Sequence, residues 1–104
     1  MNFNNYKRIK TAIKGKGIYN LWVADTPAKK ALGLSRVLSL PKKCGMIFLN
    51  DEDVSTPFTM KNTKIPLTII FLDKNFNILE VFNCRPYEKK SIQPSKSYRY
   101  VIEI

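Results

Sequence analysis

The sequence predicts a mostly β (α+β) fold, with a single compact antiparallel sheet, curled or barrel-like, and one short helix. Segments rich in β-branched and aromatic residues outnumber helical segments by about five or six to one. Among the last seven residues, apolar and aromatic side chains occupy every second position, with Arg99 and Glu103 between them, which is the period of a half-buried strand. The chain is 44% hydrophobic, which is sufficient for a folded globular protein. Its 104 residues are enough for one hydrophobic core and too few for two.

Residues 1–17 are expected to form a basic N-terminal arm or flexible segment, ahead of a single β-rich domain over 18–104. Two glycines and many lysines lie in the arm, and its apolar residues are sparse. Ile9 and Ile13 are four positions apart, which leaves a short amphipathic helix open as an alternative.

A strand over 18–24 and a short helix over 25–33 are expected next. The strand contains β-forming apolar residues. Thr26 can cap the helix N-terminus, Pro27 suits the first helical position, and Gly33 can adopt the left-handed conformation that ends a helix. A helix of about two turns must pack on a larger element to be stable.

The middle of the chain is expected to alternate between strands and polar turns. A basic connector over 34–43 leads to an apolar strand over 45–49. Residues 50–53 are then predicted to form a polar turn, and 57–60 a second short extended piece. The three adjacent acidic residues of that turn lack the ligand spacing of a calcium loop, so a solvated turn is favoured over a cation site.

The longest apolar run, over 66–72, predicts the central strand. Turn-forming residues over 73–77 and an apolar segment over 78–82 then predict a hairpin. A long loop over 84–97, which contains two prolines, follows this hairpin.

The final strand, over 98–104, is predicted to bury one face and to expose Arg99 and Glu103 on the other. Its tyrosines have two interpretations. Together with Tyr87, and near Arg85 and Arg99, they can stack on bases in a nucleic-acid platform. Alternatively, the tyrosines of the terminal strand, Tyr98 and Tyr100, can simply pack in the core, and the packing interpretation is favoured.

The formal charge of +10 favours anionic partners such as nucleic acid, acidic proteins or anionic lipids. The basic residues are scattered along the chain, so a solvated basic surface is preferred to nucleic-acid binding. The chain contains no histidine, which excludes His-based acid–base catalysis, His-activated nucleophiles and His-ligated metals. No apolar run approaches the roughly 20 residues that cross a bilayer, so no membrane association is expected. Cys44 and Cys84 are expected to be free thiols, although one disulfide is arithmetically possible.

Lys61, Asn62 and Thr63 are the candidate ligand-binding residues. An ammonium, an amide and a hydroxyl close together can hold a phosphate, a carboxylate or a sugar. The alternative is structural, with the Asn62 and Thr63 side chains bonding their own backbone in a turn and Lys61 extending from a sheet edge. No catalytic residue, metal site or cofactor is predicted.

The chain resembles the bacterial and archaeal domain-of-unknown-function family 192. The resemblance rests on segments in matching order over roughly 18–104, of which Phe-Thr-Met-Lys-Asn-Thr-Lys-Ile-Pro-Leu over 58–67 is the most specific. It implies a small β-rich fold and no established activity. Thr59 stands where the family has tryptophan, and Ser35 stands where it has methionine. The family pattern continues beyond Ile104, so a truncated C-terminus is expected to leave a sheet edge or pocket wall open.

Three functional hypotheses follow. The first is a non-enzymatic binding or accessory module that holds an unknown protein partner or a small anionic or polar ligand near Lys61, Asn62 and Thr63. The second is a structural or accessory component of a larger assembly such as a phage particle, and the third is an enzyme of unknown reaction. The expected location is cytoplasmic, or the virion if the chain is of phage origin. The first hypothesis is preferred.

Overall fold

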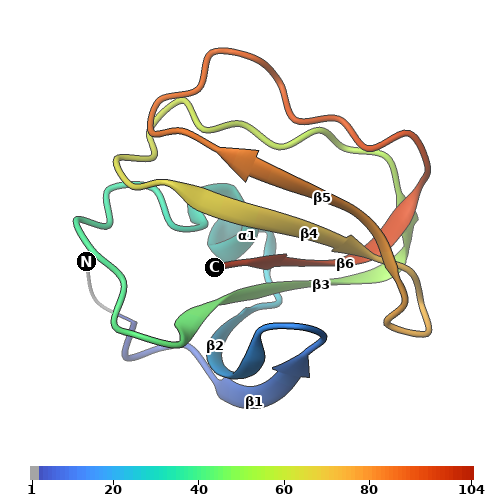
Figure 1. The fold of residues 1–104 in the computed structure, drawn as a ribbon, viewed down its shortest axis with the longest axis horizontal. Coiled ribbons are helices and arrows are strands. Elements are labelled where there is room, and N and C mark those ends of the chain that lie inside the picture. The colour runs from blue at the N-terminus through green and yellow to red at the C-terminus, as the bar shows by residue number, and fades with distance from the viewer. Residues whose placement is uncertain (1–2) are drawn as a thin grey trace.

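The computed structural model describes residues 3–104, which form a six-stranded mixed sheet and one short helix (Figure 1). The predicted fold class, mostly β with one short helix, is confirmed. The elements in chain order are β1 (Arg8–Ile13), β2 (Gly17–Ala24), α1 (Pro27–Leu32), β3 (Cys44–Val54), β4 (Leu67–Leu72), β5 (Ile78–Cys84) and β6 (Tyr98–Glu103).

The strand order is β1-β2-β3-β6-β4-β5, and the sheet is curled but not closed into a barrel. All neighbouring strands are antiparallel except β2 and β3, which are parallel, so the sheet is mixed and not wholly antiparallel. The connection from β2 to β3 contains α1, and such a crossover is what a parallel pair requires.

The N-terminal residues differ from their prediction, because 8–13 form strand β1 where an arm or a weak helix was expected. β1 and β2 make a tight hairpin, in which the Lys16 amide donates to the Ile13 carbonyl at 2.9 Å. Gly15 and Gly17 have φ angles of 79° and 99°, which favour glycine and allow this turn. Only Ile13 of β1 is buried, so the apolar pattern was too sparse to predict an edge strand.

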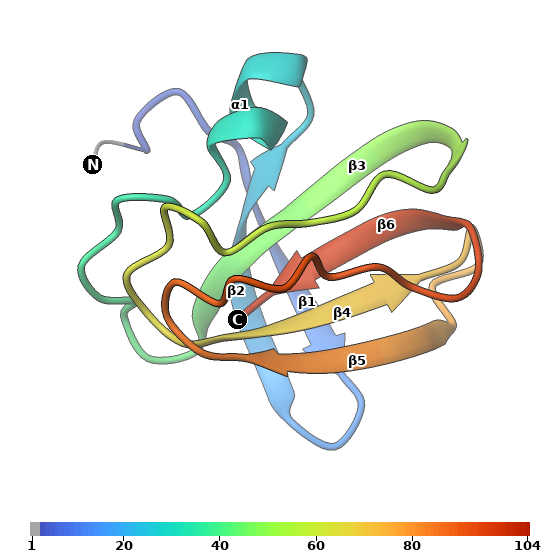
Figure 2. The same cartoon turned by 90° about the horizontal axis from the view of Figure 1, so that it is seen from above.

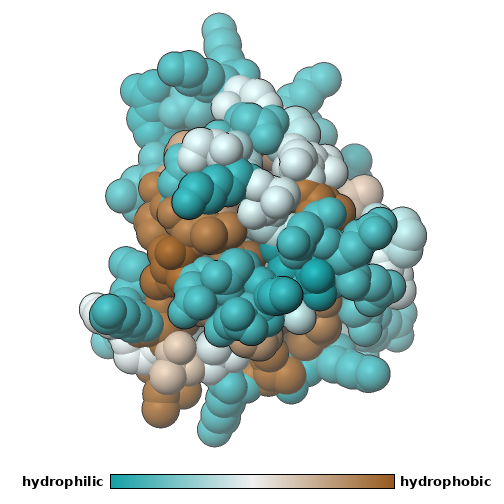
Figure 3. Space-filling view, turned by 90° about the vertical axis from the view of Figure 1, so that its right-hand side faces the viewer, coloured by the Kyte–Doolittle hydropathy of each residue, from teal (hydrophilic) through white to brown (hydrophobic). Residues whose placement is uncertain are grey.

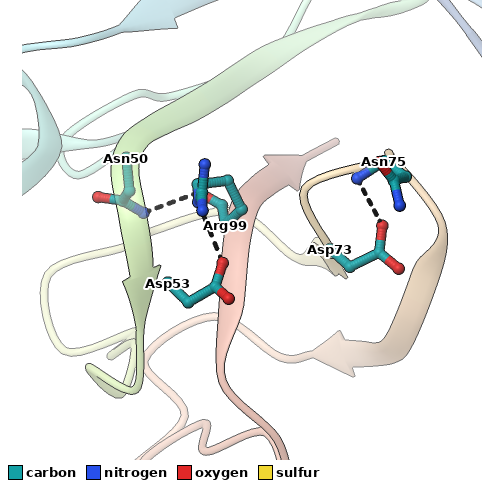
Figure 4. Close-up of polar contacts among 5 residues, drawn as sticks. All are labelled: Asn50, Asp53, Asp73, Asn75 and Arg99. Atoms are coloured by element: carbon teal, nitrogen blue, oxygen red, sulfur yellow. Dashed lines mark hydrogen bonds and ion pairs between the residues drawn. The ribbon is translucent and has the colours of Figure 1, made fainter.

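Strand β3 continues through 50–53, where a turn was predicted. Across from it, β6 keeps an irregular register between Leu49 and Val54. The Asn50 amide donates to the Arg99 carbonyl at 3.1 Å, and Arg99 Nε lies 3.0 Å from an Asp53 carboxylate oxygen (Figure 4). These contacts with β6 hold polar residues in an extended conformation that their composition did not indicate.

The helix begins and ends where predicted: Thr26 Oγ1 accepts from the Lys29 amide at 3.2 Å, and Gly33 ends the helix. Gly33 has a positive φ of 51°, but its ψ of −133° differs from the left-handed conformation that was expected. None of the residues of α1 is buried, contrary to the expectation that its apolar side chains would pack on the core. The helix is attached through the segment after it, where Leu34 and Val37 are buried.

Thr26→Ala is expected to destabilise the protein by about 1 kcal/mol, because an exposed two-turn helix depends strongly on its cap. Urea denaturation followed by circular dichroism measures the change. Thr26→Ser is the matched control, since it keeps a hydroxyl acceptor and should stay within a few tenths of a kcal/mol of the wild type. An equal loss in both variants would contradict a capping role.

The sheet buries apolar side chains on both faces. The first face is covered by the segment after α1 and by the loops after β3 and β5 (Figure 2), and its cluster contains Trp22, Ala24, Leu34, Val37, Met46, Phe48, Met60, Leu67, Ile69, Phe71, Cys84, Ile92, Tyr98 and Val101. The opposite face carries a smaller cluster of Ile13, Leu21, Val23, Ile47, Ile70, Leu72 and Ile102. The inner strands therefore alternate between two apolar environments and not between core and solvent.

This double burial corrects the prediction for the last strand. Glu103 was expected on an exposed polar face, but it is 4% exposed and lies on the first face of the sheet. β6 lies between β3 and β4, where Glu103 is paired with Met46 and Ile69. The centre of the sheet is thus the β3–β6 pair, and β4, predicted as the central strand, is next to the edge strand β5.

The remaining connections agree with their predictions. The β4–β5 hairpin is closed by Asp73, whose carboxylate accepts from the amides of Asn75 and Asn77 at 2.8 and 2.9 Å. Cys44 and Cys84 are free thiols. Over 3–104 no helix is long and apolar enough to cross a bilayer.

Candidate functional site

A cavity of about 370 Å³, called here the α1 cavity, opens between α1, the segment after it, strands β3 and β6, and the loop after β3. Its apolar lining consists of Ala31, Leu32, Gly33, Leu34, Phe48, Val54, Pro57, Phe58 and Tyr98. Its polar lining consists of Lys30, Ser35, Asn50, Thr56, Thr59, Asn62, Thr63 and Glu103. An apolar wall with a few converging polar groups is the usual construction of a small-molecule site.

Residues 60–63 form a tight turn at this cavity. The Thr63 amide donates to the Met60 carbonyl at 3.0 Å, and the Lys61 amide donates to Thr59 Oγ1 at 3.1 Å. The Asn62 carbonyl accepts from the amide of Arg36 at 3.2 Å, which ties the turn to the segment after α1. The turn is therefore held by its backbone and by Thr59.

The three predicted site residues occupy different positions around this turn. Asn62 and Thr63 line the α1 cavity, Asn62 as an exposed residue and Thr63 at 6% exposure. Lys61 is exposed and is not part of the lining. Within residues 3–104, neither the Asn62 amide nor the Thr63 hydroxyl makes a side-chain hydrogen bond, so these groups do not hold the turn.

Glu103 was not among the predicted site residues, yet it lies in the same cavity. Its side chain emerges from β6 between Met46 and Ile69. Burial raises the pKa of Glu103 to about 8, which keeps most of this carboxyl protonated at neutral pH. Thr63 and Glu103 are the two buried polar or charged residues of the described chain, and both line the α1 cavity.

The walls of the cavity are fixed by hydrogen bonds between elements. The Lys30 ammonium donates to the Asn50 side-chain oxygen at 2.9 Å, which joins α1 to β3. The Tyr98 hydroxyl donates to the carbonyl of Thr56, which anchors the loop after β3, and burial raises the pKa of Tyr98. These contacts join α1 to β3, and β6 to the loop after β3.

Asp73 and Tyr100 lie outside the lining of this cavity, whereas Tyr98 is part of it. Asp73 serves the β4–β5 turn, where the amide of Asn77 is the main cause of its lowered pKa. Tyr98 is buried, and Tyr100 stacks on Phe76 with ring centroids 4.5 Å apart, so both rings pack against the protein. Among residues 3–104, no group of three or more acidic or cysteine side chains is arranged around a common point that could hold a metal ion.

A second cavity, of about 440 Å³, lies on the opposite face of the sheet between β1 and the β4–β5 hairpin. Its lining is mainly apolar, with Lys14 at one side. Figure 3 shows the side of the molecule that carries the β4–β5 turn, where hydrophobic side chains gather in a patch bordered by hydrophilic ones. Phe76 and Ile78, in and after this turn, are 56% and 43% exposed.

The chain is similar to a known protein family and to solved structures. A family model described as DUF192, an uncharacterized ACR, matches residues 9–104. A crystal structure of a protein of unknown function from Novosphingobium aromaticivorans is similar, with a TM-score of 0.80, 28% identity, and coverage of 95% of this chain and 72% of that chain. A second, from Sinorhizobium meliloti and described as a proposed transcription regulator, has a TM-score of 0.79, 24% identity, and coverage of 95% and 79%. No curated protein matches the sequence significantly.

Proposed function

The chain belongs to the DUF192 family of uncharacterised proteins, and we propose that it is a non-enzymatic binding module whose small ligand occupies the α1 cavity. One observation carries the proposal: the two buried polar or charged residues of the described chain, Thr63 and Glu103, both face this cavity. A buried polar group costs free energy unless it is hydrogen-bonded, and a bound ligand can supply that bond.

The turn at 60–63 supports the same function. Its backbone conformation is maintained without the side chains of Asn62 and Thr63, whose amide and hydroxyl therefore remain available for a ligand. A site on a fixed turn loses little conformational entropy when it binds. Lys61 lies in the same turn outside the cavity lining, where its charge would attract an anionic ligand towards the rim.

The size and lining of the cavity indicate the kind of ligand. A volume of about 370 Å³ suits a small metabolite and not a macromolecule. The apolar wall, which includes Phe48 and Phe58, would contact its carbon skeleton. The polar groups at the turn and on β6 would orient its oxygen or nitrogen atoms.

Asn62→Ala is expected to weaken ligand binding by about tenfold while the melting temperature stays within a few degrees of the wild type. The lost amide contacts the ligand and not the turn. A library of small polar and anionic fragments, screened by ¹H–¹⁵N NMR, identifies compounds that shift cavity resonances, and titration of the best one gives Kd. Lys61→Ala should cause a smaller loss that diminishes with added salt.

Lys64→Ala is the matched control, since Lys64 is an exposed neighbour outside the cavity lining. It should leave Kd unchanged. A large fall in melting temperature for Asn62→Ala would assign this residue a structural role. A screen in which no fragment of the library shifts a resonance of the cavity would contradict the proposed function.

A further inference from the structure

We propose that Glu103 acts as a neutral carboxylic acid that donates a hydrogen bond to a carbonyl or carboxylate oxygen of the ligand in the α1 cavity. This inference rests on the proposed function and names the chemical group that the site selects. It assigns to Glu103 a binding role that involves no chemical reaction.

The backbone fixes where this carboxyl group lies. Glu103 is the last residue of β6 and is flanked by β3 and β4. Its Cα therefore cannot move without disturbing β3, β4 and β6. Glu103 Oε1 lies 3.9 Å from the position that a Cβ on Gly33 would occupy. This short separation places the carboxyl oxygen beside the end of α1, where Gly33 and Glu103 both line the cavity.

The Glu103 carboxyl group has hydrogen-bonding capacity that the protein does not use, so it is available to a ligand. Over residues 3–104, Glu103 makes no side-chain hydrogen bond and no ion pair. In the same part of the chain, no fully enclosed side-chain nitrogen or oxygen lacks a partner. The Glu103 oxygens consequently reach the cavity, where a ligand atom can meet them.

The charged and titratable groups around Glu103 do not offset the effect of burial on its pKa. From α1, the Lys30 ammonium lines the cavity but bonds to Asn50. From β5, the Cys84 thiol has a pKa raised by burial and then by Glu103 and Glu88. No cation is paired with Glu103 in the described residues, and burial raises its pKa to about 8.

A neutral acid selects among ligands in a definite way. Its hydroxyl donates to an acceptor oxygen, so an amide, ketone or carboxylate gains a strong hydrogen bond. A ligand ammonium gains no ion pair from an uncharged acid and must also lose its hydration. A ligand with a carbonyl or carboxylate group is therefore favoured over an amine of the same size.

Butyramide, butyrate and butylammonium test this selection, because they share a carbon chain and differ in the polar group. Each is titrated into the ¹⁵N-labelled full chain at pH 6, with cavity resonances followed by NMR. Butyramide or butyrate is expected to bind at least about tenfold more tightly than butylammonium. Butyrate binding should weaken as pH rises from 6 to 9, because the Glu103 acid loses its proton and then repels the carboxylate.

Glu103→Gln is the informative variant, since its amide keeps a donor but cannot ionise. It should retain butyramide binding. Its butyrate binding should not weaken between pH 6 and 9, as that of the wild type is expected to do. Direct NMR titration of the Glu103 carboxyl carbon provides the second measurement.

The outcomes separate the inference from the function on which it rests. Preferential binding of butylammonium, or titration of Glu103 below pH 6, would overturn the donor role and leave the cavity as a binding site. A failure of all three fragments to shift cavity resonances would overturn the proposed function and the inference with it.

Discussion

Gly45→Ala is expected to destabilise the protein by at least about 3 kcal/mol, because β3 has no room for a side chain at this position. A Cβ on Gly45 would overlap the Glu103 carbonyl oxygen and lie 2.7 Å from Ile104 Cγ2. Backbone atoms cannot rotate away as the end of a flexible side chain can. The strand β6, which carries Glu103 into the α1 cavity, would have to separate from β3.

Chemical denaturation of Gly45→Ala and Gly15→Ala distinguishes steric overlap from loss of conformational freedom. Gly15 has a φ of 79° and no heavy atom within 4 Å of its would-be Cβ, so alanine there should cost only about 1 kcal/mol. Gly45 shows the opposite situation, with crowding and no positive φ. Similar losses for the two variants would refute the close approach of β3 and β6.

The sequence predicted most of the strands because their apolar runs or alternation are local signals. The helix was predicted from its ends, through Thr26 and Gly33, and the structure shows both caps. Strand β1 was missed because its apolar residues are sparse, and the second half of β3 was missed because its residues are mainly polar. Both are held by pairing with a neighbouring strand, a long-range contact that a local pattern does not contain.

The candidate site was partly accessible to sequence reasoning. Asn62 and Thr63 attracted attention as polar residues between apolar runs, and they line the α1 cavity. Glu103 was misassigned because period-two alternation was interpreted as one buried face and one solvated face. That interpretation fails in an inner strand with apolar clusters on both faces, where an acidic residue is buried whichever face it occupies. The available signal for a buried acidic residue was a single glutamate within the apolar run at the end of the chain.

Glu103→Gln is expected to be more stable than the wild type by up to about 5 kcal/mol at pH 8.5, whereas the two proteins should be similar at pH 4.5. The reason is the difference between the pKa of about 8 in the folded protein and the ordinary value of 4.5. Between these values the unfolded chain has lost the proton while the folded chain holds it. Raising the pH through this window therefore favours unfolding, and the loss is complete above the folded pKa.

The measurement is the free energy of unfolding in urea for both proteins at pH 4.5, 6 and 8.5. Glutamine has nearly the shape of a protonated glutamate, so the two proteins should be close in stability at pH 4.5 and should diverge as pH rises. Glu52→Gln, which changes an exposed glutamate of β3, is the control and should follow the wild-type curve. Subtracting the wild-type curve from that of Glu103→Gln removes the contributions of all other titratable groups. Parallel curves would mean that the Glu103 carboxyl is ionised in the folded protein, and the cavity would then present a carboxylate that favours cationic ligands over carbonyl or carboxylate ones.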